Sequence, residues 1–166
     1  KAFDRIEYDA LFNALADQGV SAGYRALLQC LYTGQRGTTD GESFFAIGRG
    51  VRQRDVLSPM LFNAGLEEAM KQWKRRLCNK GWRIDTDIGS EKLTNVRYAD
   101  DLLLFATSKE EAVHMLDVLK QELQKVGLSV NSGKTRILTT ETQSVSSADP
   151  TVVDCCGSPV EIVPKG

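Results

Sequence analysis

The chain contains little of what holds small stapled or metal-bound domains together. Among its 166 residues there is one histidine, His114, and the four cysteines have no CxxC spacing, which argues against a zinc site. Cys155 and Cys156 are neighbours that pair only with strain, so the cysteines predict an intracellular, reducing compartment. No run approaches the roughly 18 consecutive apolar residues of a membrane span and no signal peptide opens the chain, so no membrane partner is expected. The first residue is Lys1 and not Met, which indicates a fragment or a processed piece.

The chain also lacks an excess of charge of either sign. Its formal net charge is −1, and 42% hydrophobic with 26% charged residues is ordinary for a globular domain with a real core. Bulk charge therefore does not draw the chain to a polyanion, so any phosphate contact must be local. Two basic clusters favour such contacts, and a solvated surface is the alternative. They contain Lys71, Lys74, Arg75, Arg76, Lys80 and Arg83 in one case, and Arg49, Arg52 and Arg54 in the other.

Helical periodicity of the apolar residues predicts four helices. Ser21 and Ser108 stand at N-cap positions, and Gly19 and Gly127 stand where left-handed caps end two of the helices. The third helix carries one apolar stripe, which is typical of a buried helix face. The helices are expected at residues 7–18, 21–34, 58–77 and 109–126, and the stripe consists of Phe62, Leu66, Met70, Trp73 and Leu77.

Hairpins separate the predicted helices, and this alternation predicts an α+β domain with an antiparallel sheet. The hairpins centre on Asp40-Gly41, which is predicted as a two-residue turn, on residues 98–101 and on Gly157-Ser158. Short strands are expected at 128–130 and 136–140, and a mobile loop is expected at 142–150.

The tetrapeptide Tyr98-Ala99-Asp100-Asp101 carries most of the chemical information. It lies between Asn95-Val96-Arg97 and an apolar run at residues 102–106, a pattern that places two adjacent carboxylates at the tip of a hairpin. Two like charges with buried flanks are unfavourable unless a cation shares them, and carboxylate oxygens suit Mg²⁺. The motif therefore favours phosphoryl transfer on a nucleotide, with a solvated Asp-Asp turn as the alternative.

A second motif is a decoy. Ser132-Gly133-Lys134-Thr135 resembles the end of a P-loop, which needs a glycine five residues before its Gly-Lys pair. Leu128 holds that position, and Gly127 stands one place too early. A P-loop nucleotide-triphosphatase is therefore not expected, although Lys134 in a turn can still meet a phosphate.

Four segments, in this order, resemble the reverse transcriptases of non-LTR (LINE-like) retrotransposons. The match covers nearly all of the first 138 residues, and four segments in sequence are more specific than any one of them. The segments are Lys1-Ala2-Phe3-Asp4, residues 50–63 beginning Gly-Val-Arg-Gln, Tyr98-Ala99-Asp100-Asp101, and residues 127–134 ending Ser-Gly-Lys.

The resemblance implies a right-hand polymerase palm, with an antiparallel sheet backed by helices and a partial fingers insertion. Palm-like parts are expected at residues 1–6 and 54–140, the fingers-like insertion at 7–53, and a loop and hairpin leading toward a thumb at 141–166. The implied activity is RNA-directed DNA synthesis, with an RNA template, a DNA primer, the RNA–DNA hybrid and dNTPs as partners. The implied location is the nucleus if the retrotransposon is eukaryotic.

The resemblance also implies roles for residues. Asp100 is expected to ligate Mg²⁺, or Mn²⁺ in its place, in a two-metal site, with Asp101 as its partner. Phe3, beside Ala2, resembles a steric gate that leaves no room for a 2′-hydroxyl, and a core phenylalanine is the compatible alternative. Lys134 resembles a lysine that protonates the departing pyrophosphate, with a surface lysine as the alternative.

In the glycine- and arginine-rich loop, Gln53 resembles the glutamine that touches the nucleotide and the template, and an exposed loop glutamine is the alternative. Arg54 stands where the family usually has glycine, so it either blocks the pocket or contacts phosphate. The basic residues expected to contact nucleic acid are Arg49, Arg52, Lys71, Lys74 and Arg75.

The family's first catalytic aspartate would precede Lys1, so this fragment by itself is expected not to polymerise. A decayed or domesticated remnant that binds nucleic acid or protein without catalysis is the alternative function. An RNA-directed RNA polymerase palm is a third possibility, and Phe3 argues against it because such an enzyme must admit the 2′-hydroxyl.

Overall fold

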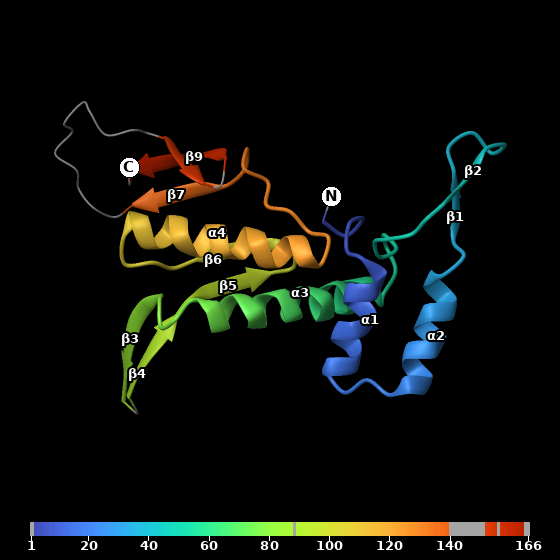
Figure 1. Ribbon diagram of the computed structural model, residues 1–166, viewed down its shortest axis with the longest axis horizontal. Helices are drawn as coiled ribbons and strands as arrows, with labels where there is room; N and C mark the ends of the chain where they lie inside the picture. Colours follow the sequence, from blue (N-terminus) through green and yellow to red (C-terminus); the bar gives the residue numbers. More distant parts are fainter. Residues whose placement is uncertain (1, 88, 140–151, 156, 165–166) are drawn as a thin grey trace. The chain divides into compact units, whose positions relative to one another are not determined.

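The computed structural model describes residues 2–87, 89–139, 152–155 and 157–164 (Figure 1). The chain divides into two compact units, one of residues 1–72 and 122–129 and the other of residues 73–121 and 130–166. The described residues form helices and short, mostly antiparallel strands, as the predicted α+β class requires. In this described part, no helix is long and apolar enough to cross a membrane.

The first unit opens with two helices, α1 (Tyr8–Asp17) and α2 (Ala22–Tyr32). Helix α1 ends at the predicted left-handed cap, because Gly19 has φ of 81° and its N–H closes on the carbonyl of Ala16. The side chain of Ser21 accepts a hydrogen bond from the N–H of Tyr24, which confirms the predicted N-cap of α2. Helix α1 buries Leu11, Phe12, Ala14 and Leu15.

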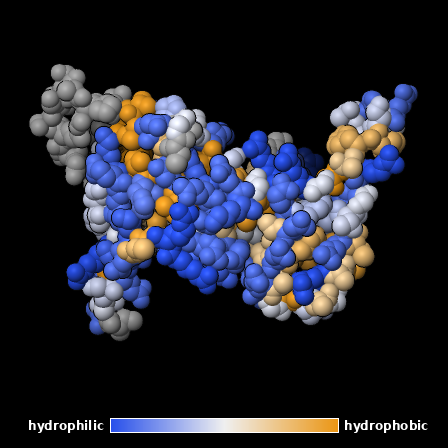
Figure 2. Space-filling model, in the orientation of Figure 1, coloured by the Kyte–Doolittle hydropathy of each residue, from blue (hydrophilic) through white to orange (hydrophobic). Residues whose placement is uncertain are grey.

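Helix α2 buries much less of its apolar face than α1 does. Tyr24 is 70% exposed and Leu27 is 57% exposed, and the hairpin that follows carries Phe44 and Phe45 exposed to similar extents. Figure 2 shows hydrophobic residues on the surface in the region of α2 and of this hairpin. The helical spacing of the apolar residues therefore predicted the position of α2 correctly, but it did not predict whether those residues are buried.

Strands β1 (Arg36–Thr38) and β2 (Phe44–Ala46) form the first hairpin, and the predicted two-residue turn at Asp40-Gly41 is wrong. Thr38 pairs with Phe44, so the loop has the five residues 39–43. The carboxylate of Asp40 accepts hydrogen bonds from the N–H groups of Glu42 and Ser43. Because that carboxylate satisfies the loop's backbone donors, the chain adopts a wider turn.

Helix α3 (Ser58–Arg76) carries the predicted stripe, and helix α4 (Lys109–Lys125) ends at Gly127, whose φ is 81°. The Oγ of Ser108 accepts from the N–H of Glu111, which confirms the predicted cap of α4. The carboxylate of Glu111 turns to the N–H of Thr107 and to that of Gly81. All five stripe residues are buried, namely Phe62, Leu66, Met70, Trp73 and Leu77.

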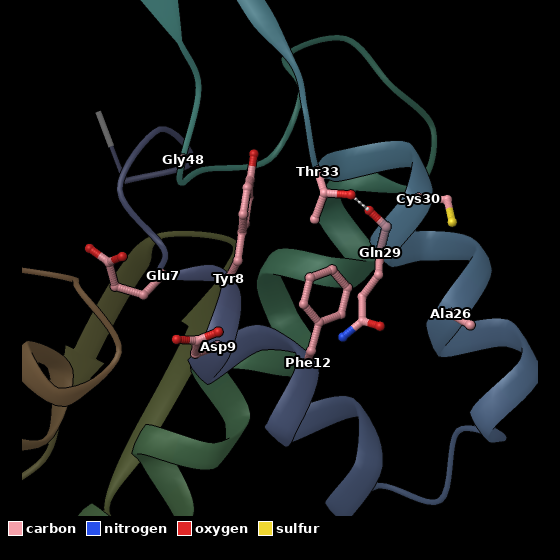
Figure 3. A pocket seen from close by; sticks show the side chains of 9 residues that line it. All are labelled: Glu7, Tyr8, Asp9, Phe12, Ala26, Gln29, Cys30, Thr33 and Gly48. Carbon is pink, nitrogen blue, oxygen red and sulfur yellow. Dashed lines mark hydrogen bonds between the residues drawn. The ribbon is translucent and has the colours of Figure 1, made fainter.

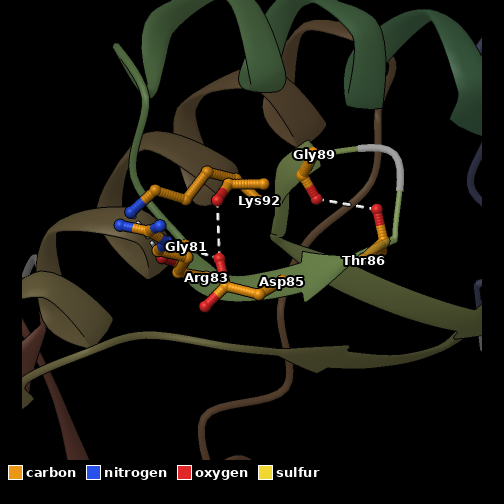
Figure 4. A network of polar contacts seen from close by, with 7 residues as sticks. Gly81, Arg83, Asp85, Thr86, Gly89 and Lys92 are labelled. Carbon is orange, nitrogen blue, oxygen red and sulfur yellow. Dashed lines mark hydrogen bonds and ion pairs between the residues drawn. The ribbon is translucent and has the colours of Figure 1, made fainter.

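The second unit contains two ribbons and one small sheet. Strand β3 (Trp82–Thr86) pairs with β4 (Gly89–Leu93), and at their turn the hydroxyl of Thr86 donates to the carbonyl of Gly89 (Figure 4). Strand β5 (Asn95–Tyr98) pairs with β6 (Asp101–Leu104), and both pairs are antiparallel. Strands β7 (Arg136–Thr139), β9 (Ser158–Pro164) and β8 (Val152–Cys155) form the sheet in that order.

Two strand predictions need correction. The predicted single antiparallel sheet is four separate small sheets among the described residues, and β7 pairs with β9 in parallel. Residues 128–130 form no strand, because the N–H of Leu128 closes the end of α4 on the carbonyl of Leu123 and is not available to a ladder. The expected hairpin near residue 157 is confirmed, with Cys155 opposite Ser158. The predicted loop at 142–150 lies outside the described residues.

Candidate nucleotide and metal site

The acidic pair lies at the tip of the β5–β6 hairpin. Tyr98 pairs with Asp101, so Ala99 and Asp100 form a two-residue loop at the tip of the predicted hairpin. Ala99 has φ of 53°, the left-handed conformation that such a tight loop requires at its first central position. The hairpin therefore holds Asp100 at the tip and Asp101 at the first position of β6.

The flanks of this hairpin were expected to be buried, but one face of it is exposed, while Leu102 and Leu104 on the other face are half-buried. Tyr98 is 84% exposed, and Val96 and Leu103 are each about half exposed. The reason is that β5 and β6 pair only with each other among the described strands. The electrostatic argument for a shared cation therefore rests on the adjacency of the two carboxylates and not on a dry environment.

The donor set fits a hard divalent cation in kind. Both carboxylates are exposed, and within the described residues neither makes a hydrogen bond or an ion pair that would occupy its oxygens. Mg²⁺ takes one or two carboxylates and completes its shell with water or substrate oxygens. Across the described part of the chain, no group of three His, Cys, Asp or Glu side chains is close enough to hold a metal by itself. Asp100 and Asp101 are thus a two-carboxylate platform.

In the first unit, the segment that begins the chain is joined to the glycine- and arginine-rich loop. The N–H of Val51 donates to the carbonyl of Phe3 at 2.7 Å, and the N–H of Gly50 donates to that of Ile6 at 2.8 Å. Gly50 has φ of 86°, and a Cβ there would lie 2.8 Å from the backbone of Asp4. Only glycine therefore permits this approach.

Phe3 and Gln53, both predicted at the nucleotide, lie on the two sides of this junction. The ring of Phe3 stacks on that of Phe62 in α3, with centroids 4.4 Å apart and planes 11° apart. The amide Nε2 of Gln53 donates to the Oδ1 of Asp4 at 2.7 Å. The next residue, Arg54, is exposed and has φ of 64°, a conformation that favours glycine.

Lys134 lies in the turn that precedes β7, in the second unit. Its backbone N–H and that of Thr135 both donate to the carbonyl of Asn131, which confirms the predicted turn. The side chain of Lys134 is exposed. A turn of this kind presents the ammonium to solvent, where an anion can reach it.

A family model described as "Reverse transcriptase (RNA-dependent DNA polymerase)" matches residues 1–151. The chain belongs to the reverse transcriptase family. Its relatives include Pol polyproteins of R2 retrotransposable elements: 29% identity over 138 residues to that of R2DM in Drosophila melanogaster, 31% over 139 residues in Bradysia coprophila, and 31% over 139 residues in Popillia japonica.

These matches cover 81 to 82% of this chain but only 12%, 15% and 19% of the lengths of the three relatives. They confirm the resemblance to non-LTR retrotransposons drawn from the four segments.

The two units divide the predicted site residues of this reverse transcriptase chain between them. The first unit brings together the chain's opening residues and the loop before α3, and the second holds the acidic hairpin and the turn before β7. The first contains Ala2, Phe3, Arg49, Arg52, Gln53, Arg54 and Lys71, and the second contains Lys74, Arg75, Asp100, Asp101 and Lys134.

Two of the basic residues predicted to contact nucleic acid are engaged within the protein. Arg52 donates to the carbonyl of Leu31 at 2.8 Å and lies over the ring of Tyr32. Arg49 faces Glu7 at 3.7 Å. Their positions hold the loop against α1 and α2, which the sequence pattern did not reveal. Sequence reasoning also missed Asp4 as a neighbour of Gln53, since no local pattern signals a bond between residues 49 positions apart.

A cavity of about 530 Å³ opens between α1 and α2, and no predicted nucleotide or metal ligand lines it (Figure 3). Its wall includes Tyr8, Phe12, Gln29 and Cys30. Burial raises the pKa of Tyr8, and the neighbouring Tyr32 adds to that shift. The cavity is thus a feature of the helix pair, separate from the residues assigned to the reaction.

Proposed function

We propose that this chain is the core of an RNA-directed DNA polymerase that joins deoxynucleotides by two-metal chemistry. The observation that carries the proposal is the tight β5–β6 hairpin, whose two-residue loop sets Asp100 beside Asp101 with their oxygens unengaged among the described residues. Membership of the reverse transcriptase family supports the reaction class. Palm-like parts at residues 1–6 and 54–140, a fingers-like insertion at 7–53 and a hairpin leading toward a thumb at 141–166 complete the proposed layout.

Asp100 and Asp101 would hold Mg²⁺, which lowers the pKa of a primer hydroxyl and neutralises charge on the pyrophosphate when it is bound. The hairpin places Asp100 in its tight loop and Asp101 at the start of β6, so the two carboxylates are adjacent before substrate arrives. Lys134 is assigned the proton donor to the leaving group, a role that an exposed ammonium in a fixed turn supports.

Phe3 is assigned the steric gate, with Ala2 beside it. The buried ring of Phe62 supports one face of the Phe3 ring by stacking. A rigid aromatic edge under the sugar disfavours a 2′-hydroxyl by steric exclusion. Gln53 and Arg54 follow on the loop that is hydrogen-bonded to the same segment, where an amide and a cation suit a nucleotide.

The proposed partners are an RNA template, a DNA primer and dNTPs. Hybrid duplexes are A-like, so contacts are expected mainly with backbone and sugar. The exposed basic residues Lys74 and Arg75 near the end of α3 suit such phosphate contacts.

A non-catalytic nucleic-acid or protein binder is the second candidate. Arg54 favours it, because a long side chain in a left-handed position stands where the family usually has glycine. The two candidates differ in whether nucleotides are incorporated.

The metal site is tested directly in the 166-residue chain. Mn²⁺ titrated into the wild type, followed by electron paramagnetic resonance, is expected to bind weakly, and Asp100→Asn is expected to lose that binding. The matched control is Asp87→Asn, since Asp87 is an exposed aspartate in the loop of the β3–β4 ribbon. Equal affinity in wild type and Asp100→Asn would remove the metal site.

Catalysis is tested by primer extension on an RNA template. The enzyme in this assay is the full-length product of the reading frame that encodes these residues. Incorporation of dNTPs that Asp100→Asn abolishes and Asp87→Asn leaves intact is the expected result. Nucleic-acid binding without incorporation would favour the second candidate.

A further inference from the structure

Asp4 and Gln53 form a hydrogen bond across 49 residues of sequence, with Gln53 Nε2 as donor and Asp4 Oδ1 as acceptor at 2.7 Å. Both side chains are exposed, so neither is required to fill the core. Gln53 is a residue assigned to the nucleotide, whereas Asp4 has no role in the reaction as proposed above. The bond therefore connects Gln53, which is assigned to the proposed site, to Asp4, which has no assigned function there.

The chemistry of the two groups fixes how the amide lies. An ionised carboxylate accepts hydrogen bonds and donates none, so only the NH₂ end of the glutamine amide can face Asp4. The amide is planar, and its carbonyl oxygen Oε1 therefore occupies the other arm, turned away from Asp4. Asp4 thus decides which end of Gln53 is offered to a ligand.

The backbone holds the two partners in this relation. The bonds from Val51 to Phe3 and from Gly50 to Ile6 bracket Asp4 on the opening segment and lead directly into Gln53 on the loop. An exposed hydrogen bond to a charged acceptor contributes much less to stability than a shielded one. Ordering a glutamine side chain costs about as much as this bond contributes, so the backbone junction is what makes the orientation persist.

We propose that Asp4 is a positioning residue that presents the carbonyl oxygen of Gln53, and not its amino group, to the substrate. This inference rests on the proposed function. The complementary group must be a hydrogen-bond donor, which means a sugar hydroxyl or an N–H of a base. A phosphate oxygen accepts and does not donate at neutral pH, so it would have to use the second N–H of the Gln53 amide, and the exchange of donor and acceptor below separates that case.

The first test is a double-variant cycle in steady-state primer extension. Asp4→Ala and Gln53→Met each raise the KM for dNTP, about five- to tenfold for one neutral hydrogen bond, while kcat changes little. The double variant is no worse than Gln53→Met alone, because Asp4 acts only through the amide. Independent effects that multiply in the double variant overturn the inference.

The second test exchanges the donor and the acceptor. Gln53→Glu alone sets two carboxylates against each other and raises KM. In the pair Asp4→Asn with Gln53→Glu, the asparagine NH₂ donates to one glutamate oxygen and the other oxygen still faces the substrate as an acceptor. Recovery of KM to near the wild-type value is expected. Failure to recover, with the variant folded, means that the substrate offers an acceptor there and overturns the proposal.

Two substrate changes identify the donor. The penalty of Gln53→Met disappears with dideoxynucleotides if the donor is a hydroxyl of the incoming sugar, and with a DNA template if it is a 2′-hydroxyl of the template. Persistence in both cases assigns it to a base N–H.

The wild type and Asp100→Asn run beside these variants as controls. A wild type that incorporates nothing overturns the proposed function and this inference with it. An active wild type whose Asp4→Ala variant keeps the same KM overturns the inference alone.

Discussion

The indole Nε1 of Trp73 donates a hydrogen bond to the backbone carbonyl of Met115 at 2.8 Å, and both side chains are completely buried. The bond joins the end of α3 to α4 inside the second unit, where Arg76 also donates to Gln121. The apolar stripe of α3 thus includes one polar group whose partner is defined by tertiary structure.

Trp73→Phe removes that donor and leaves space beside Met115. We expect it to lower the free energy of unfolding by about 1–3 kcal/mol, measured by urea denaturation followed by circular dichroism. The control is Trp82→Phe, because Trp82 is 52% exposed. A similar cost for the two substitutions would contradict the role given to the buried bond.

Gly19 and Gly127 offer a matched pair, since both cap helices with φ of 81°. A Cβ at Gly19 would meet nothing within 4 Å, whereas at Gly127 it would lie 2.6 Å from the carbonyl oxygen of Arg5. Both alanine variants incur the left-handed penalty of roughly 1–2 kcal/mol. Gly127→Ala is expected to cost at least about 1 kcal/mol more than Gly19→Ala in the same denaturation experiment, since it also displaces backbone. Equal costs for the two substitutions would show that the backbone of Arg5 moves away from the added Cβ at little cost in free energy.

Arg54 has φ of 64° on a loop where a Cβ is unfavourable. Arg54→Gly is expected to be more stable than Arg54→Ala by about 0.5–1 kcal/mol, because glycine adopts a positive φ without the steric penalty that alanine incurs. The greater conformational entropy of glycine in the unfolded chain keeps this difference small. Thermal or chemical denaturation of the two variants measures the difference. If alanine is the more stable replacement, the loop carries no such strain.

The carboxylate of Asp40 should titrate at an unusually low pH. Hydrogen bonds from the backbone of Ser43 and then Glu42 hold its pKa at about 2, below the ordinary 3.8. A depressed pKa stabilises the fold in full above the unfolded-state value, and this contribution is lost as pH falls from about 3.8 toward 2. The stability difference between wild type and Asp40→Asn is therefore expected at neutral pH and should vanish across that window. Nuclear magnetic resonance titration of Asp40 gives the midpoint, and a value of 3.8 or above would contradict these bonds.

Phe3 allows a test of sugar selection. Phe3→Val removes the ring that stacks on Phe62 and should raise the ratio of ribonucleotide to deoxynucleotide kcat/KM by about tenfold to a hundredfold in primer extension. Phe3→Tyr keeps the ring and serves as the control, with the ratio unchanged. An unaltered ratio in Phe3→Val would leave Phe3 as a core residue only.

Local patterns predicted the helices and the acidic hairpin well because their causes are local. The caps at Gly19, Ser21, Ser108 and Gly127 depend on a few neighbouring backbone groups, and each is present. The tight turn at Ala99-Asp100 likewise follows from adjacent residues. The prediction of a two-residue turn at Asp40-Gly41 failed for an equally local reason. The carboxylate of Asp40 accepts hydrogen bonds from the N–H groups of Glu42 and Ser43, and these bonds stabilise the five-residue loop instead.

The sequence by itself determined the helix positions, the two-carboxylate turn and, through the order of four segments, membership of the reverse transcriptase family. Tertiary structure alone decided the parallel pairing of β7 with β9, the stacking of Phe3 on Phe62 and the bond between Asp4 and Gln53. Periodicity and caps act over one or two turns of chain. Pairing, stacking and side-chain orientation depend instead on which distant groups compete for the same donor or surface, and no sequence window contains that competition.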